Sequence, residues 1–423
     1  MDTDQDVQQT KVGGTMVPIH SPLIEREITD IATIHKHIRT QKVSPVEVVS
    51  ACLKRIEQLN PKLNAFITVL ADQALEQARV AEAEIKAAKW RGPLHGIPVG
   101  IKDFYDTAGI RTTAAFERFK DRVPRKDAVG VLKLKEAGAI IIGKTNMHLL
   151  GMGTTGLDSY FGPVGNPWNA GYIPGGSSAG SAAAVASGMC YATLDTDAIG
   201  SCRLPAACCG VVGFKGTYGL VDPKGILEGE DDPGEMIRWF SHPGIMTRTV
   251  EDAALVLDVL TERHQDMTAD YFDGLAEDRN VRIGVADNFR SDPEVLAAFE
   301  RAVEKIRGLG YLMKSVAVPR NPDRGLGNIE ADRKAIAGQT FKNVDVLLLP
   351  TTTTTVPAIK SAGANPQALS PENTVFANYY GLPAISVPCG FDRNGLPLGL
   401  QIVGKPWDEA RVLHLAYQHE KLN

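Results

Sequence analysis

Two patterns of hydrophobic and polar positions alternate along the chain, and each predicts a different type of secondary structure. Apolar residues spaced three and four apart predict helices over residues 27–41, 45–59, 71–90, 127–137, 181–188, 249–262, 292–309, 371–381 and 407–422. Short apolar runs bounded by turn residues predict strands over residues 63–70, 96–103, 139–145, 191–196, 281–287, 311–319, 345–349, 384–391 and 398–404. Strands that alternate with helices predict an α/β fold with a central mixed, largely parallel sheet.

Two helix starts carry a specific cap signal. Ser44, Pro45 and Glu47 form a capping box with proline at the first helical position, and Ser370-Pro371-Glu372 offers a similar start. The apolar strand over residues 96–103 places Lys102 close to its carboxyl end. Catalytic groups of α/β sheets gather outside the carboxyl ends of strands, so Lys102 becomes a candidate for the site.

Composition narrows the class of protein. With 423 residues, 43% of them hydrophobic, the chain has ample length for a large core, and length alone favours two or three domains. The net charge of −5 without a basic block argues against nucleic acid or an acidic membrane surface as partner. No apolar run reaches the ~18 residues of a membrane span. The polar, acidic start differs from a signal peptide, which favours a cytoplasmic location.

Cysteine and glycine spacing predicts neither metal nor nucleotide. The six cysteines form no C-x-x-C pair and no Cys/His pattern for zinc, so we expect buried free thiols and no metal. Gly175 and Gly176 are not followed by the G-K-[ST] of a phosphate-binding loop. We therefore expect no cofactor.

Two serine-bearing turns dominate the stretch between residues 172 and 219. The first is Gly175-Gly176-Ser177-Ser178-Ala179-Gly180, and the second is Ile199-Gly200-Ser201. Glycine-rich turns present backbone N–H groups, which suits an anion site or an oxyanion hole. A flexible linker is the plain alternative, but a linker would not continue into the apolar run of residues 211–214.

These turns resemble the amidase signature family, whose pattern is GGSSGGS followed by TDxGGSxRxPA. The upstream HGIPVGIKD resembles the family's lysine strand, so that Lys102 matches its catalytic lysine. Lys102, Ser177 and Ser201 lie 75 and 24 positions apart, as the family's lysine, cis-serine and nucleophilic serine do. The resemblance covers nearly the whole chain. It implies one compact domain over residues 1–423, with a polar tail at about 1–26 and no cofactor.

The resemblance also implies roles for the neighbours of these three residues. The peptide between Gly176 and Ser177 would be cis, and the backbone N–H groups of Ala198, Ile199, Gly200 and Ser201 would form the oxyanion hole. Ser178, Asp197 and Arg203 would support the turns, the last two as a buried ion pair. Plain surface charges are the alternative for that pair, and Cys202 is a weaker alternative to Ser201 as nucleophile because adjacent side chains point apart.

Two departures from the family pattern change the expectation. Ile199 stands where the family has glycine, so a β-branched residue would be strained if the position needs a positive φ. The stretch at about 319–341 is short, whereas family members carry several dozen more residues there, often as helices at the substrate entrance. Either the protein has a reduced cap and an open pocket, or the sequence as given omits a segment there, and the sequence alone favours neither.

The chemistry favours hydrolysis of a C–N acyl bond in a small amide or carbamate, or a urea. A neutral Lys102 would take the proton of Ser201 through Ser177. The first alternative is the amidase subunit of a tRNA-dependent amidotransferase, and the second is a catalytically impaired scaffold, motivated by Ile199. A monomer or homodimer is expected. Residues expected to contact the substrate are Tyr105, Met152, Gly153, Tyr160 and Trp239.

Overall fold

The computed structural model describes residues 11–12, 15–16, 29–226, 239–261, 270–277, 279–319 and 326–422. Near the N-terminus the short strands β1 (Lys11–Val12) and β2 (Thr15–Met16) pair antiparallel. The rest of the predicted tail at 1–26 lies outside the described residues, as do residues 320–325 of the short stretch at 319–341.

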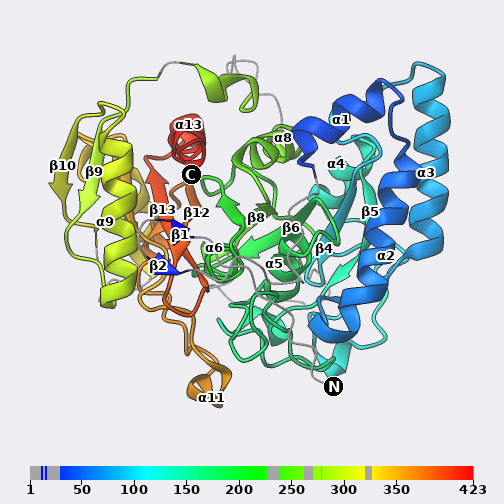
Figure 1. The fold of residues 1–423 in the computed structure, drawn as a ribbon, viewed down its shortest axis with the longest axis horizontal. Coiled ribbons are helices and arrows are strands. Elements are labelled where there is room, and N and C mark those ends of the chain that lie inside the picture. The colour runs from blue at the N-terminus through cyan, green and yellow to red at the C-terminus, as the bar shows by residue number, and fades with distance from the viewer. Residues whose placement is uncertain are drawn as a thin grey trace.

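A single 11-stranded sheet runs through the molecule (Figure 1). Its order is β10-β9-β11-β13-β12-β7-β8-β6-β4-β5-β3. The strands are β3 (Phe66–Val69), β4 (Pro98–Lys102), β5 (Ile140–Thr145), β6 (Ala192–Asp197), β7 (Val212–Lys215), β8 (His242–Thr247), β9 (Ile283–Ala286), β10 (Met313–Val316), β11 (Val346–Pro350), β12 (Ala384–Phe391) and β13 (Pro397–Gly404).

The sheet is mixed, as predicted, but it is not largely parallel. The parallel pairs are β10–β9, β11–β9, β4–β5 and β4–β6. The six other pairs are antiparallel and include all those of β7, β8, β12 and β13. The connections explain this in part. Strand β12 is followed by β13 after a short turn at residues 392–396, and a turn this short can join only antiparallel strands.

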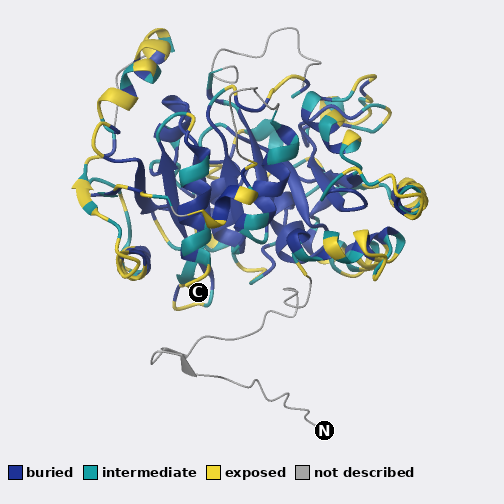
Figure 2. Ribbon diagram, turned by 90° about the horizontal axis from the view of Figure 1, so that it is seen from above, coloured by how far each residue is buried: buried dark blue, intermediate teal, exposed yellow. Residues whose placement is uncertain are grey.

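Helices cover the sheet, whose strands are buried along most of their length (Figure 2). At one end of the sheet α2 and α3 lie together, and α9 lies at the other (Figure 1). The helices are α1 (Ile31–Arg39), α2 (Pro45–Leu63), α3 (Ala71–Lys86), α4 (Val129–Glu136), α5 (Ala179–Ala186), α6 (Arg203–Cys209), α8 (Val250–Leu260), α9 (Pro293–Arg307), α10 (Ile329–Ala335), α11 (Ile359–Ala362), α12 (Val375–Tyr379) and α13 (Glu409–Glu420).

The two predicted caps have different outcomes. At the start of α2 the Glu47 amide donates to the Ser44 hydroxyl at 3.1 Å, and the Ser44 amide donates to the Glu47 carboxylate at 2.7 Å. The capping box is therefore confirmed. The predicted helix start at residue 371 is wrong, because α12 begins at Val375 after Thr374, and Ser370 only accepts a bond from the Glu372 amide within a turn.

The centre of the sheet brings the candidate residues to one edge. Strands β4 and β6 are parallel neighbours, with Ile101 opposite Leu194, so both end on the same side. Lys102 is the last residue of β4, and β6 ends at Asp197 immediately before the second serine turn. The first serine turn leads into α5, which packs against both strands. A site at the carboxyl ends of β4 and β6 follows from this topology.

Candidate active site

Lys102 lies at the centre of the site and has no exposed surface. Its Nζ is 2.7 Å from the Ser177 hydroxyl and 2.8 Å from the Thr196 hydroxyl at the end of β6. Burial disfavours the charged amine and lowers the pKa of Lys102 to about 8, against the opposing negative field of Asp195. A lysine with this pKa is partly neutral near neutral pH and is able to accept a proton.

The first serine turn is fixed by main-chain contacts. The peptide between Gly176 and Ser177 is cis, as the resemblance implies. The Ser177 carbonyl accepts a hydrogen bond from the His148 amide at 2.9 Å. Ser178 makes no side-chain cap on α5; its hydroxyl lies 3.4 Å from the Thr196 carbonyl and its amide donates to the Ser201 carbonyl at 3.1 Å. Ser178 therefore ties the two serine turns together.

The second serine turn wraps around the Asp197 carboxylate. The amides of Gly200, Cys202 and Arg203 all donate to this carboxylate, at 2.9, 3.2 and 3.3 Å. Gly200 has a φ of +124°, a conformation that L side chains rarely adopt. Ser201 is 3% exposed at the start of the turn into α6. The position of Ser201 is thus set by Asp197 together with a glycine.

Arg203 pairs with Asp197 in the interior, and neither side chain is exposed. The guanidinium donates to both carboxylate oxygens, at 2.9 and 3.0 Å. It also donates to the Asn378 side chain, the Thr374 carbonyl and the Gln401 side chain. Burial alone would raise the pKa of Asp197, but the Arg203 charge and these hydrogen bonds hold it well below its usual range. The pair is buried, not a pair of surface charges.

The turn contradicts one expectation about Ile199. Ile199 is not among the described residues with positive φ, so its β-branched side chain is not strained; the neighbouring Gly200 takes that conformation. Ile199 packs against an apolar cluster that includes Phe240 and Phe376. Of the four predicted oxyanion donors, the Gly200 amide is already bonded to Asp197, whereas no described residue accepts a bond from the amides of Ala198, Ile199 or Ser201.

Cys202 points away from the serine site. Its thiol donates to the Ile245 carbonyl at 3.3 Å, within the core beneath β8, and it has no exposed surface. Burial raises the pKa of Cys202 well above its usual value. A thiol held in this way cannot act as the nucleophile, which supports Ser201 over Cys202.

The predicted substrate contacts fall in different places. Tyr105 is 1% exposed and its hydroxyl donates to the Asp195 carbonyl at 2.6 Å, so it braces β6 from within the core and is not a substrate contact. Gly153 lies next to the first serine turn, since a Cβ built on Gly176 would be 2.9 Å from its carbonyl. Met152 and Tyr160 are exposed, and Trp239 is half-buried against the same apolar cluster as Ile199.

Sequence reasoning missed several residues that hold the site. Thr196 contacts the Lys102 amine, and Asn378 and Gln401 complete the surroundings of Arg203. Thr196 belongs to the TD pair of the family pattern and could have been found there. Asn378 and Gln401 lie 175 and 198 positions from Arg203, and no local pattern marks them.

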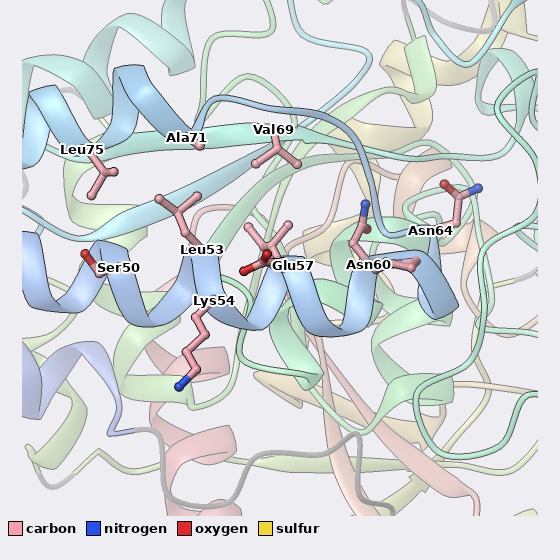
Figure 3. Close-up of a pocket in the computed structure, with 11 residues that line it drawn as sticks. Ser50, Leu53, Lys54, Glu57, Asn60, Asn64, Val69, Ala71 and Leu75 are labelled. Atoms are coloured by element: carbon pink, nitrogen blue, oxygen red, sulfur yellow. The ribbon is translucent and has the colours of Figure 1, made fainter.

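A groove of about 770 Å³ lies away from these residues, between α2, α3 and β3 (Figure 3). Leu53, Lys54, Val69 and Leu75 are among the residues that line it. None of the predicted site residues lines this groove.

In the part of the chain that the structure describes, no three His, Cys, Asp or Glu side chains gather as a metal site would require. No helix of the described ranges is long and apolar enough to cross a membrane.

Comparisons with known proteins identify the family to which this α/β fold belongs. A family model described as Amidase matches residues 47–329 and 326–413. The chain therefore belongs to the amidase family. The two matched ranges overlap at residues 326–329, which fall within the segment at about 319–341.

Similar proteins with curated names include components of a larger enzyme. A glutamyl-tRNA(Gln) amidotransferase subunit of Thermosynechococcus vestitus is 33% identical, over 92% of this chain and 97% of the relative. The protein of the same name from Geobacter sp. strain M21 is 34% identical, over 93% and 98%. The first alignment has 475 positions and this chain 423 residues, so at least 52 of those positions hold no residue of this chain.

Solved structures with the same fold include a peptide amidase and a cyclic dimer hydrolase. The peptide amidase of Stenotrophomonas maltophilia superposes with a TM-score of 0.79 at 26% identity, covering 93% of this chain and 97% of the other. A 6-aminohexanoate cyclic dimer hydrolase with bound substrate gives a TM-score of 0.80 at 26% identity, with the same coverage. The amidase family thus accounts for both fold and class of reaction.

Proposed function

We propose that the chain hydrolyses a C–N acyl bond with Ser201 as nucleophile, Ser177 as proton relay and Lys102 as base. The observation that carries the proposal is the 2.7 Å contact between the Lys102 amine and the Ser177 hydroxyl in a fully buried setting. A neutral amine keeps a lone pair for the Ser177 proton, and its N–H groups donate to Thr196. This distance lies within the range for direct proton transfer.

The reaction would proceed in two halves. Ser201 attacks the acyl carbon, its proton passes to Ser177, and the Ser177 proton passes to Lys102. The amides of Ala198, Ile199 and Ser201 are the candidate donors to the oxyanion, because Asp197 already occupies that of Gly200. The Lys102 proton returns through Ser177 to the leaving amine. Water then attacks the acyl-enzyme by the same route and frees the acid.

The names of the relatives bear on the class of substrate. The names of the relatives favour the amidotransferase alternative over hydrolysis of carbamates or ureas. In that role the chain would release ammonia from an amide and work with partner subunits on a tRNA-linked substrate. The expectation of a small molecule as sole partner, without nucleic acid, then no longer holds. A reduced cap at about 319–341 would leave an open pocket, which accommodates either role.

A labelling experiment tests the chemistry first. The full chain is treated with a fluorophosphonate, digested and analysed by mass spectrometry, and we expect the adduct on Ser201 and none in Ser201→Ala. An adduct on another residue would reject the assignment. Impaired activity without labelling would favour a scaffold instead.

A second experiment separates the two roles. Hydrolysis of a simple anilide by the isolated chain, at a rate unchanged by added amidotransferase subunits, would favour a free-standing amidase. Weak activity that rises when those subunits form a complex on size-exclusion chromatography would favour the amidotransferase role. The same columns report whether the isolated chain is a monomer or a homodimer.

A further inference from the structure

Asp195 is a fully buried carboxylate that the reaction outlined above does not use. It lies in the middle of the sheet on β6, with no exposed surface. One carboxylate oxygen, Oδ2, accepts a hydrogen bond from the Thr193 hydroxyl at 2.5 Å. The other, Oδ1, is buried and has no hydrogen-bond partner in the structure. A buried carboxylate with an unpaired oxygen is costly, so a nearby positive charge would stabilise it.

Strand register brings that positive charge to Asp195. Ile101 of β4 stands opposite Leu194 of β6, and the next residues along the two parallel strands are Lys102 and Asp195. Residues at matched positions of neighbouring strands point to the same face of the sheet. Lys102 and Asp195 thus lie side by side beneath the first serine turn. Burial raises the pKa of Asp195 and lowers that of Lys102, and the charge of each opposes this effect on the other: Lys102 favours the ionised carboxylate, and Asp195 favours the protonated amine.

The other titratable groups around this pair do not change charge near neutral pH. Tyr105, Cys190 and Cys202 face Asp195, and burial raises the pKa of each. Asp197 acts on Lys102 but remains ionised, because its pKa is held low by Arg203. His148 acts on Lys102 and is kept neutral by burial, which lowers its pKa. The hydroxyls of Ser178 and Ser181 also face Asp195 and lower its pKa, so they favour the ionised carboxylate; they do not titrate themselves.

We propose that the Asp195 carboxylate holds a proton on the Lys102 amine at neutral pH, and so sets the pH at which the Ser177 relay becomes competent. Asp195 is a positioning residue in this scheme, because it acts through Lys102 and touches no substrate. The inference rests on the proposed function for its effect on catalysis. The interaction between the Asp195 and Lys102 charges does not depend on activity, and an experiment without substrate tests it.

The catalytic effect is measured on Asp195→Asn. Asparagine keeps the acceptor for Thr193 and removes the charge. Because a neutral neighbour no longer favours the ammonium form, the acid limb of kcat/KM and of Ser201 labelling should move to lower pH, by about one unit or more. A limb that stays in place or moves to higher pH overturns the proposal. Should Asp195→Asn fail to fold, Asp195→Ser removes the same charge with a smaller side chain and has the same expected shift.

Asp252→Asn is the matched control. Asp252 on α8 is also fully buried, accepts one bond from the Ala32 amide at 3.0 Å and has one oxygen without a partner. It lies outside the serine site, so Asp252→Asn should leave the acid limb unchanged. An equal shift in this variant would mean that loss of any buried carboxylate moves the limb, and would overturn the proposal.

A double-mutant cycle decides the pairing without any activity. Urea unfolding is measured near neutral pH for Asp195→Asn, Lys102→Met and the double variant. If the two charges interact, the double variant loses less stability than the sum of the single losses. Additive losses overturn the proposal. If the wild type neither turns over substrate nor labels on Ser201, the proposed function fails, while the cycle still decides whether Asp195 holds the proton on Lys102.

Discussion

The Ser178 amide donates a hydrogen bond of 3.1 Å to the Ser201 carbonyl, so the main chain itself joins the two serine turns. Because this bond uses no side chain of Ser201, the geometry of both turns should survive a change of that side chain. The variant Ser201→Ala is therefore a clean probe of chemistry.

Ser201→Ala should reduce kcat for anilide hydrolysis by a factor of about 10⁴ or more, because the nucleophile is lost while binding remains. Circular dichroism and the thermal midpoint should match those of the wild type. Cys202→Ala is the paired control and should keep most of the activity, since its thiol faces the core. The reverse pattern would identify Cys202 as the nucleophile.

Lys102 should give the pH profile an acid limb. Its folded pKa of about 8 is lower than that of a free lysine, so the amine is neutral, and a base, only above that value. The rate should therefore fall as pH drops through about 8. Lys102→Met should lower the rate by orders of magnitude and remove this limb from any residual activity. A limb that persists in Lys102→Met and disappears in His148→Gln would place the base elsewhere.

Asp197→Asn should destabilise the fold, because it leaves the Arg203 charge buried without its partner. We expect a loss of about 3–5 kcal/mol in the free energy of unfolding, measured with urea. Since the folded pKa of Asp197 is depressed, its contribution is present above the unfolded pKa of about 4 and is lost as pH falls below it. The control is Glu76→Gln in an exposed pair with Arg79, for which a loss under about 1 kcal/mol is expected.

Gly200→Ala should impair both stability and turnover. A Cβ at this position would collide with the Thr374 hydroxyl and lie 2.9 Å from the Thr374 Cβ, at a φ that alanine rarely adopts. Thr374→Ala in the same chain removes the collision with the hydroxyl, but neither the close approach to the Cβ of residue 374 nor the unfavourable φ, so the double variant should recover part of the lost thermal midpoint. No recovery would mean that backbone strain alone, or the contact with Leu204, dominates.

Ile199→Gly should not raise kcat, because Ile199 has no strained conformation to relieve. The side chain packs against the apolar cluster that includes Phe240, so its loss should lower the free energy of unfolding by about 1–3 kcal/mol. If Ile199 also contacts the acyl group, KM should rise for a long acyl anilide and stay constant for a short one. A higher kcat on both substrates would restore the idea of a strained turn.

The strands that frame the site could be predicted, and the interior charges could not. Residues 96–103 and 139–145 are apolar runs between turn signals, and they form β4 and β5. By contrast β8 contains Pro243 and Gly244 and lacks any alternation, so its place between β6 and β7 depends on tertiary contacts. Glycine and proline normally argue against a central strand.

In the candidate site, too, some residues carry a local sequence signal and others do not. Serine turns and a lysine at a strand end carry local signals, and their spacing in the family pattern located Lys102, Ser177 and Ser201. Asp195 and Tyr105 have no such signal, since an acid or a tyrosine at a strand end is exposed more often than buried. Their burial follows from the neighbouring elements, which cover both faces of β6, and only the structure gives that arrangement.

Arg203 reaches side chains of Asp197, Asn378 and Gln401, which belong to β6, the α12 region and β13. The early and late parts of the chain are therefore joined by hydrogen bonds from a single buried guanidinium. Separating the two parts leaves the buried Arg203–Asp197 pair without its Asn378 and Gln401 partners, which makes partial opening costly. In hydrogen–deuterium exchange, the amides of β6 and β13 should accordingly open in one cooperative event rather than in sequence.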